Sequence, residues 1–140
     1  MRSQLGNAQN GLDHAAAAEK EFRRSLEINA QLGWPNRRVP TYFARFLAEH
    51  GRDREAEQVL KDLLRRALDC GPGYRELARL YADTGRLQEA VATGRKALEY
   101  PQGGKDDERA LHMILGKALA GLGRNAEADE HWSWVKANPR

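Results

Sequence analysis

The sequence predicts an all-α fold made of paired helices, and three observations support this prediction. Apolar residues recur at intervals of three and four, for example from Tyr74 to Tyr81, which is the periodicity of a helix with one buried face. No stretch shows the sustained alternation of a half-buried strand. The hexapeptide pattern Gly-Arg-x-x-Glu-Ala occurs three times, as GRDREA, GRLQEA and GRNAEA. Repeated helical units are therefore expected.

The hexapeptide is predicted to end one helix and begin the next. Glycine adopts a positive φ at low cost, so Gly85 can end the helix that precedes it. Glu89 then falls in the first turn of the following helix, where the helix dipole favours a carboxylate. The same pattern begins at Gly51 and Gly123, 34 residues before and 38 residues after Gly85. Helix pairs should therefore follow one another with a period near 34 residues.

Alignment on these turns divides the chain into four units of a single domain, residues 1–140. The units cover about residues 1–34, 37–70, 71–105 and 109–140, and the segments GWPN, CGPG and YPQGGKDD join them. The first unit lacks the glycine of the hexapeptide, and its turn is expected near Asp13. Four units of two helices predict eight helices.

Small residues recur where the two helices of each unit should cross. Those of the first helices are Gly6, Ala44, Ala78 and Gly116, and those of the second helices are Ala18, Ala56, Ala90 and Ala128. A small side chain lets two helices approach closely, so a bulky substitute is expected to push the pair apart.

This arrangement resembles the tetratricopeptide repeat, a helix-turn-helix unit of about 34 residues. The third unit carries the repeat's pattern best, with Tyr74, Leu77, Ala78, Tyr81, Ala90, Ala97, Leu98 and Pro101. The resemblance covers essentially the whole chain. It departs from the pattern at Gly94, where a large aromatic residue belongs, and at Pro40, which replaces the first aromatic residue of the second unit. The resemblance implies a right-handed α-solenoid whose first helices line a concave groove for a peptide or a partner helix.

Counting back from each turn predicts which residues face this groove, because positions at helical spacing share one flank. Six positions before the turn, the second, third and fourth units carry Arg45, Arg79 and Lys117. The full set of predicted groove residues is Asn7, Arg38, Thr41, Arg45, Arg75, Arg79, Met113 and Lys117. Arginine side chains bind carboxylates and phosphates through paired hydrogen bonds. The predicted ligand is therefore a protein or peptide that carries Asp, Glu, a phosphate or a free C-terminus.

Two alternatives to an acidic ligand remain open. Glu49 and Asp83 stand four positions after Arg45 and Arg79, and such pairs can neutralise each other. The groove would then take a neutral or mixed ligand, or its charges would simply be solvated. The Lys and Asn positions of the family's carboxylate clamp for chaperone tails are not matched, which disfavours that ligand.

Composition and motifs give no support for an enzyme, a cofactor, a metal site, a nucleic-acid partner or a membrane span. The formal net charge is only +3, with 31% charged residues of both signs. The four histidines have no Cys or carboxylate partners at strong zinc spacing, and no phosphate-binding glycine loop is present. With one cysteine and no apolar leader in MRSQLGNAQN, a cytoplasmic location is expected.

These observations favour a non-catalytic module for protein binding or scaffolding, as part of a bacterial-looking array. The alternatives are a structural or oligomerisation segment of a longer array, or an accessory region of a larger enzyme. Both ends look cut, because no polar helix covers the last unit. Trp134, on another face from Trp132, is the predicted residue for self-association through such an uncapped end.

Overall fold

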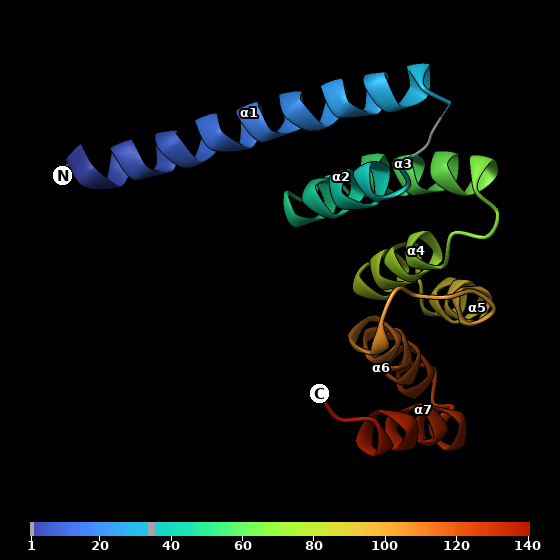
Figure 1. The fold of residues 1–140 in the computed structure, drawn as a ribbon. Helices are drawn as coiled ribbons and strands as arrows, with labels where there is room; N and C mark the ends of the chain where they lie inside the picture. The colour runs from blue at the N-terminus through green and yellow to red at the C-terminus, as the bar shows by residue number, and fades with distance from the viewer. Residues whose placement is uncertain (1, 34–35) are drawn as a thin grey trace.

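The computed structural model describes residues 2–33 and 36–140, with side chains from residue 14 onward. In these residues the chain forms seven helices and no strand, which confirms the predicted all-α fold (Figure 1). The helices are α1 (Arg2–Gln31), α2 (Arg38–Glu49), α3 (Asp53–Arg66), α4 (Gly71–Asp83), α5 (Leu87–Leu98), α6 (Lys105–Gly121) and α7 (Asn125–Ala137).

Three successive helix pairs, α2/α3, α4/α5 and α6/α7, stack into a solenoid below α1 (Figure 1). The first helices of the pairs lie next to one another, because α4 contacts both α2 and α6. This arrangement brings side chains from α2 and α4 to a common surface, although the two helices are separated by α3 in the sequence.

The three hexapeptide turns have the same backbone structure. Gly51, Gly85 and Gly123 have φ angles of 75°, 81° and 78°. The residue after each glycine donates its N–H to the carbonyl group five positions earlier, in the pairs Arg52–Leu47, Arg86–Tyr81 and Arg124–Leu119. This hydrogen bond and the positive φ together define a Schellman motif at the end of each first helix.

The arginine and the glutamate of the hexapeptide form an ion pair in all three turns, at 2.7 Å each: Arg52–Glu55, Arg86–Glu89 and Arg124–Glu127. Arg52 also pairs with Glu19 on α1, and Arg86 with Glu57 on α3. These side chains therefore connect the first turn to α1 and the second turn to α3. Neighbouring Arg52 and Arg23 hold the pKa of Glu19 at about 2.

The first unit differs from its prediction, because α1 is one continuous helix rather than a helix pair. No turn occurs at Asp13, so the prediction of eight helices is wrong. Four consecutive alanines, residues 15–18, follow this position, and alanine is the strongest helix former. The expected hexapeptide glycine is also absent there. Nothing in the local sequence therefore ends the helix before Gln31, and Gly33, with a φ of 82°, follows it.

The core follows the crossing points within and between the helix pairs. Ala56 and Ala90 on the second helices are fully buried, and Ala128 is 2% exposed. At the top of the stack, Phe22 of α1 packs against Phe43 and Phe46 of α2, with ring centroids 5.5 Å and 5.4 Å away. The aromatic cluster attaches the described part of α1 to the first complete pair.

We predict that Gly116→Val lowers the free energy of unfolding by about 2 kcal/mol, as expected for overpacking. A Cβ atom at Gly116 would lie 2.7 Å from Cε2 of the rigid Trp132 ring, so α6 and α7 would have to separate. Urea denaturation checks this value. The matched control is Ala120→Val on the exposed side of the same helix, where a loss of at most about 0.5 kcal/mol is expected. Equal losses in the two variants would contradict the close contact.

Candidate functional site

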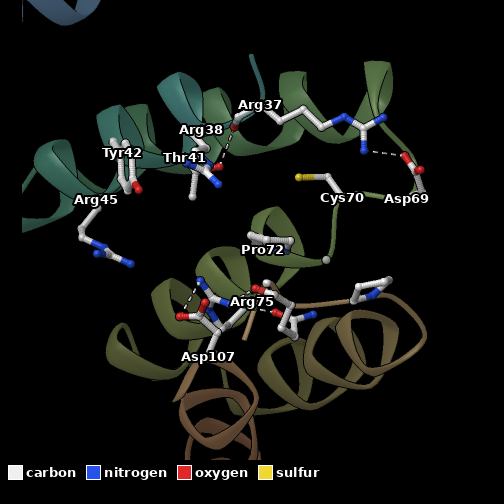
Figure 2. Close-up of a pocket in the computed structure, with 14 residues that line it drawn as sticks. Arg37, Arg38, Thr41, Tyr42, Arg45, Asp69, Cys70, Pro72, Arg75 and Asp107 are labelled. Atoms are coloured by element: carbon white, nitrogen blue, oxygen red, sulfur yellow. Dashed lines mark hydrogen bonds and ion pairs between the residues drawn. The ribbon is translucent and has the colours of Figure 1, made fainter. Parts of the chain in front are cut away.

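Two cavities lie along the surface shared by α2 and α4. The larger one, which we call the arginine cavity, has a volume of about 640 Å³ (Figure 2). It is lined by Arg37, Arg38, Thr41, Tyr42, Arg45, Asp69, Cys70, Gly71, Pro72, Arg75, Pro101, Gln102, Gly103 and Asp107. The smaller one, the alanine cavity, has a volume of about 210 Å³ and is lined by Ala44, Arg45, Ala48, Glu49, Ala56, Leu60, Glu76, Arg79, Leu80 and Asp83. Arg45 lines both cavities, so they adjoin along α2.

Most of the predicted groove residues lie at these cavities. Arg38, Thr41, Arg45 and Arg75 line the arginine cavity, and Arg79 lines the alanine cavity. The three residues on α2 share one face because they are spaced by three and four positions.

The remaining predicted groove residues are placed differently. Met113 is half-buried and Lys117 is exposed on α6, and neither lines the two cavities. The side chain of Asn7 lies outside the described residues.

The centre of this surface is Glu76, a residue that the sequence analysis did not predict. Its side chain is only 4% exposed. Its Oε1 atom lies 2.5 Å from Nη2 of Arg45, 3.6 Å from Nη1 of Arg79 and 3.9 Å from Nη2 of Arg75. Three guanidinium groups from two helices thus surround one buried carboxylate. The hydrogen bond to Glu76 raises the pKa of Arg45 above its usual value.

The expected intrahelical pairs are replaced by this cluster. In the described part of the chain, neither Glu49 nor Asp83 forms an ion pair with Arg45 or Arg79. Glu76 stands 31 positions after Arg45, so the interaction depends on how α2 and α4 pack. Sequence spacing along a single helix could not reveal it.

Arg75 closes the lower side of the arginine cavity. It is buried, and its Nη1 group donates hydrogen bonds to the backbone carbonyl of Gln102 at 3.3 Å and to its side-chain Oε1 at 3.0 Å. Gln102 is itself 3% exposed and donates to the carbonyl of Ala97. The joint before α6 is therefore packed onto α4. Burial lowers the pKa of Arg75 relative to an exposed arginine.

The two cavities carry opposite charge. Four arginines and two aspartates line the arginine cavity, which gives a net charge of +2. Two arginines and three carboxylates line the alanine cavity, which gives −1. The surface predicted to be basic is therefore basic only in part, and its positive charge is concentrated where α2 and α4 begin.

The arginines of the larger cavity differ in how far they are neutralised. Arg37 pairs with Asp69 at 2.8 Å, and both side chains are about half exposed. The guanidinium group of Arg38 is exposed and forms no ion pair with a described residue. Arg45 is paired with Glu76, and its side chain is 40% exposed. Arg38 thus keeps unpaired donors for an anion in the cavity.

A family model for the tetratricopeptide repeat matches residues 74–102, which cover most of α4 and all of α5. This match supports the resemblance of the chain to the tetratricopeptide repeat family. Among curated proteins, none matches it. Tetratricopeptide repeats typically serve as non-catalytic modules for protein interaction, with a concave surface formed by stacked units. The two cavities lie on helices α2 and α4, the first helices of adjacent helix pairs.

The last helix pair, α6/α7, contains a cluster of three rings. Nδ1 of His112 on α6 lies 2.8 Å from Nδ1 of His131 on α7. The Trp134 ring stacks on His112 with a centroid distance of 4.1 Å and an interplanar angle of 20°. Trp134, the predicted contact for self-association, is thus half-buried within its own repeat.

Among the described side chains, those of residues 14–33 and 36–140, no three His, Cys, Asp or Glu are grouped so that they could hold a metal ion. No helix in the described part of the chain combines the length and the apolar character required to cross a membrane.

We predict that Glu76→Gln lowers the free energy of unfolding by about 1–3 kcal/mol, because it leaves three guanidinium groups facing a neutral amide. Chemical denaturation measures the loss. Glu49→Gln is the matched control: it removes the exposed carboxylate nearest to Arg45 in the same helix, and a change below about 0.5 kcal/mol is expected. A larger loss in Glu49→Gln than in Glu76→Gln would contradict the observed pairing.

We also predict that the protein becomes less stable as the pH falls from about 6.5 to about 4. Burial, and then the nearby His131, lower the pKa of His112 to about 4, so in this window the unfolded chain binds more protons than the folded chain. The loss should be about 1–2 kcal/mol after allowance for partial exposure. The free energy of unfolding, measured across this pH range, checks it.

His112→Phe keeps a ring on Trp134 but removes the titrating group, so it should reduce this pH dependence. His14→Gln on the exposed surface of α1 should leave it unchanged. If the free energy of unfolding changes with pH equally in the wild type and in His112→Phe, other groups cause the effect.

Proposed function

We propose that this chain is a non-catalytic interaction module that holds an acidic segment of a partner protein along α2, α4 and α6. The observation that carries the proposal is the arginine cavity, where four arginines from adjacent helix pairs line one hollow with a net charge of +2. Arginine binds carboxylates and phosphates with defined geometry, so such a hollow favours an anionic ligand.

The residues that would contact the segment have different roles. Arg38 and Lys117 are exposed and form no ion pair with a described residue, so their full charge is open to a ligand. Arg45 and Arg79 already share Glu76, which keeps their guanidinium groups ordered. Met113, half-buried on α6, would supply an apolar contact.

The floor of the surface suits an extended chain. Ala44 and Ala48 line the alanine cavity together with Leu60 and Leu80. Their short side chains leave room for the ligand backbone, and their apolar surface would bury a small side chain next to the acidic residue. The two adjoining cavities thus support the binding of several consecutive residues.

The double variant Arg38→Glu, Lys117→Glu tests the proposal. Partners are first identified by pull-down with mass spectrometry, and the affinity for the captured segment is then measured by titration calorimetry. We expect the double variant to bind at least about tenfold more weakly, because two attractive charges become repulsive. Its circular dichroism spectrum should match that of the wild type.

Arg54→Glu is the control for this test, because Arg54 is an exposed residue of α3 that lines neither cavity. Its affinity should stay within about twofold of the wild type. If the double variant retains wild-type affinity, the groove is not the binding surface. If both variants lose affinity equally, the attraction is a general effect of net charge.

Self-association is a second candidate function, and exposed apolar residues at the end of α1 favour it. Ile28 on α1 is 49% exposed, and Leu32 in the turn directly after α1 is 69% exposed. A second copy could bury both residues. Light scattering over a concentration series tests this function, and a monomer at every concentration would remove it.

A further inference from the structure

We infer that the arginine cavity binds a phosphoryl group on a serine or threonine side chain of the partner segment. This inference rests on the proposed function and specifies which acidic group the segment carries. It is carried by the charge of the cavity, by the donors that remain free in it and by the adjoining alanine cavity.

The cavity keeps an excess of positive charge. Its lining carries four arginines against Asp69 and Asp107, and Glu76 also pairs with one of the four, Arg45. A phosphorylated side chain carries about −1.5 to −2 charges at neutral pH, whereas one Asp or Glu carries a single charge. The positive cavity therefore attracts a phosphoryl group more strongly than a carboxylate.

The free donors come from both sides of the hollow. Figure 2 shows Arg38 and Arg45 extending from α2 toward the hollow, with Arg75 at its opposite side on α4. Arg38 has no ion-pair partner among the described residues, and the side chain of Arg45 remains 40% exposed beside its bond to Glu76. The three oxygens of a phosphoryl group can accept from donors in several directions, unlike the planar pair of a carboxylate.

Two existing ion pairs are weak enough to rearrange around such a group. Arg37 and Asp69 are 48% and 65% exposed in their 2.8 Å pair, and an exposed pair contributes little stability. Arg75 and Asp107 stand 3.7 Å apart, beyond hydrogen-bonding distance. A phosphoryl group near Arg37 or Arg75 could therefore draw on their N–H donors at small cost.

The surroundings favour a phosphorylated peptide over a free phosphate. Arg45 also lines the alanine cavity, whose floor includes Ala44, Ala48 and Leu80. Residues that flank the phosphorylated side chain would lie there and bury apolar surface. Free phosphate would use the arginines alone and forgo this contact.

Three degenerate nonapeptide libraries test the inference. They share randomised flanks and carry phosphoserine, glutamate or serine at the centre, and inorganic phosphate is titrated separately. Binding is followed through the NMR signals of the arginine Nε–Hε groups. We expect the phosphoserine library to bind at least about tenfold more tightly than the glutamate library and inorganic phosphate, and to shift the signals of Arg38, Arg45 and Arg75.

Arg38→Ala should weaken binding of the phosphoserine library by at least about tenfold, since it removes an unpaired donor. It should not affect folding, because Arg38 is exposed and unpaired in the described structure. Arg54→Ala, a surface arginine outside both cavities, should leave binding unchanged.

Several outcomes would overturn the inference. Equal binding of the glutamate and phosphoserine libraries would leave the acidic groove intact but remove the preference for phosphate. Equal binding of inorganic phosphate would show that the peptide chain contributes nothing. Unshifted arginine signals, or unchanged binding in Arg38→Ala, would exclude the cavity. A different result would contradict the proposed function: equal affinity of the captured partner segment for the wild type and for the Arg38→Glu, Lys117→Glu variant.

Discussion

The rest of the structure depends on one backbone constraint, the Schellman turn at Gly51, Gly85 and Gly123. Each glycine adopts a positive φ near 80°, which side chains larger than hydrogen disfavour. The N–H of the following arginine then bonds to the carbonyl five positions earlier. Because all three turns are alike, each second helix leaves its first helix in the same way. The alanine five positions after each glycine is thereby buried against the first helix of its own pair.

This constraint explains which parts of the molecule could be predicted from the sequence. Since α2 and α4 end in equivalent turns, counting back from Gly51 and Gly85 selects residues that line one cavity: Arg38, Thr41, Arg45 and Arg75. The same counting failed for the first unit, where no such glycine follows Asp13 and the alanine-rich segment continues as helix. Local sequence thus determines helix ends and side-chain faces well, as long as the turn motif itself is present.

The features that were missed depend on contacts between helices that are distant in sequence. Glu76 meets Arg45 across the α2–α4 interface, 31 positions away, whereas the sequence offered only the neighbours Glu49 and Asp83 as partners. Arg52 and Arg86 of the hexapeptides likewise pair with Glu19 on α1 and Glu57 on α3. These distances are set by how the helix pairs stack, and that depends on the packing of many side chains.

Glu76 also determines how the groove would present its charge. It makes the lining of the alanine cavity slightly negative, and it pairs with Arg45, so the positive charge of the arginine cavity comes mainly from its other arginines. A bound segment in the proposed mode would therefore have a direction, with its acidic residue at the start of α2 and α4 and a neutral or basic residue near Asp83. In addition, Arg45 and Arg79 are already held by Glu76. These two side chains therefore lose less conformational entropy when a ligand binds to them. The buried carboxylate thus lowers the total positive charge of the groove. In return, it makes the two ends of the groove differ in charge and holds two of its arginines in place.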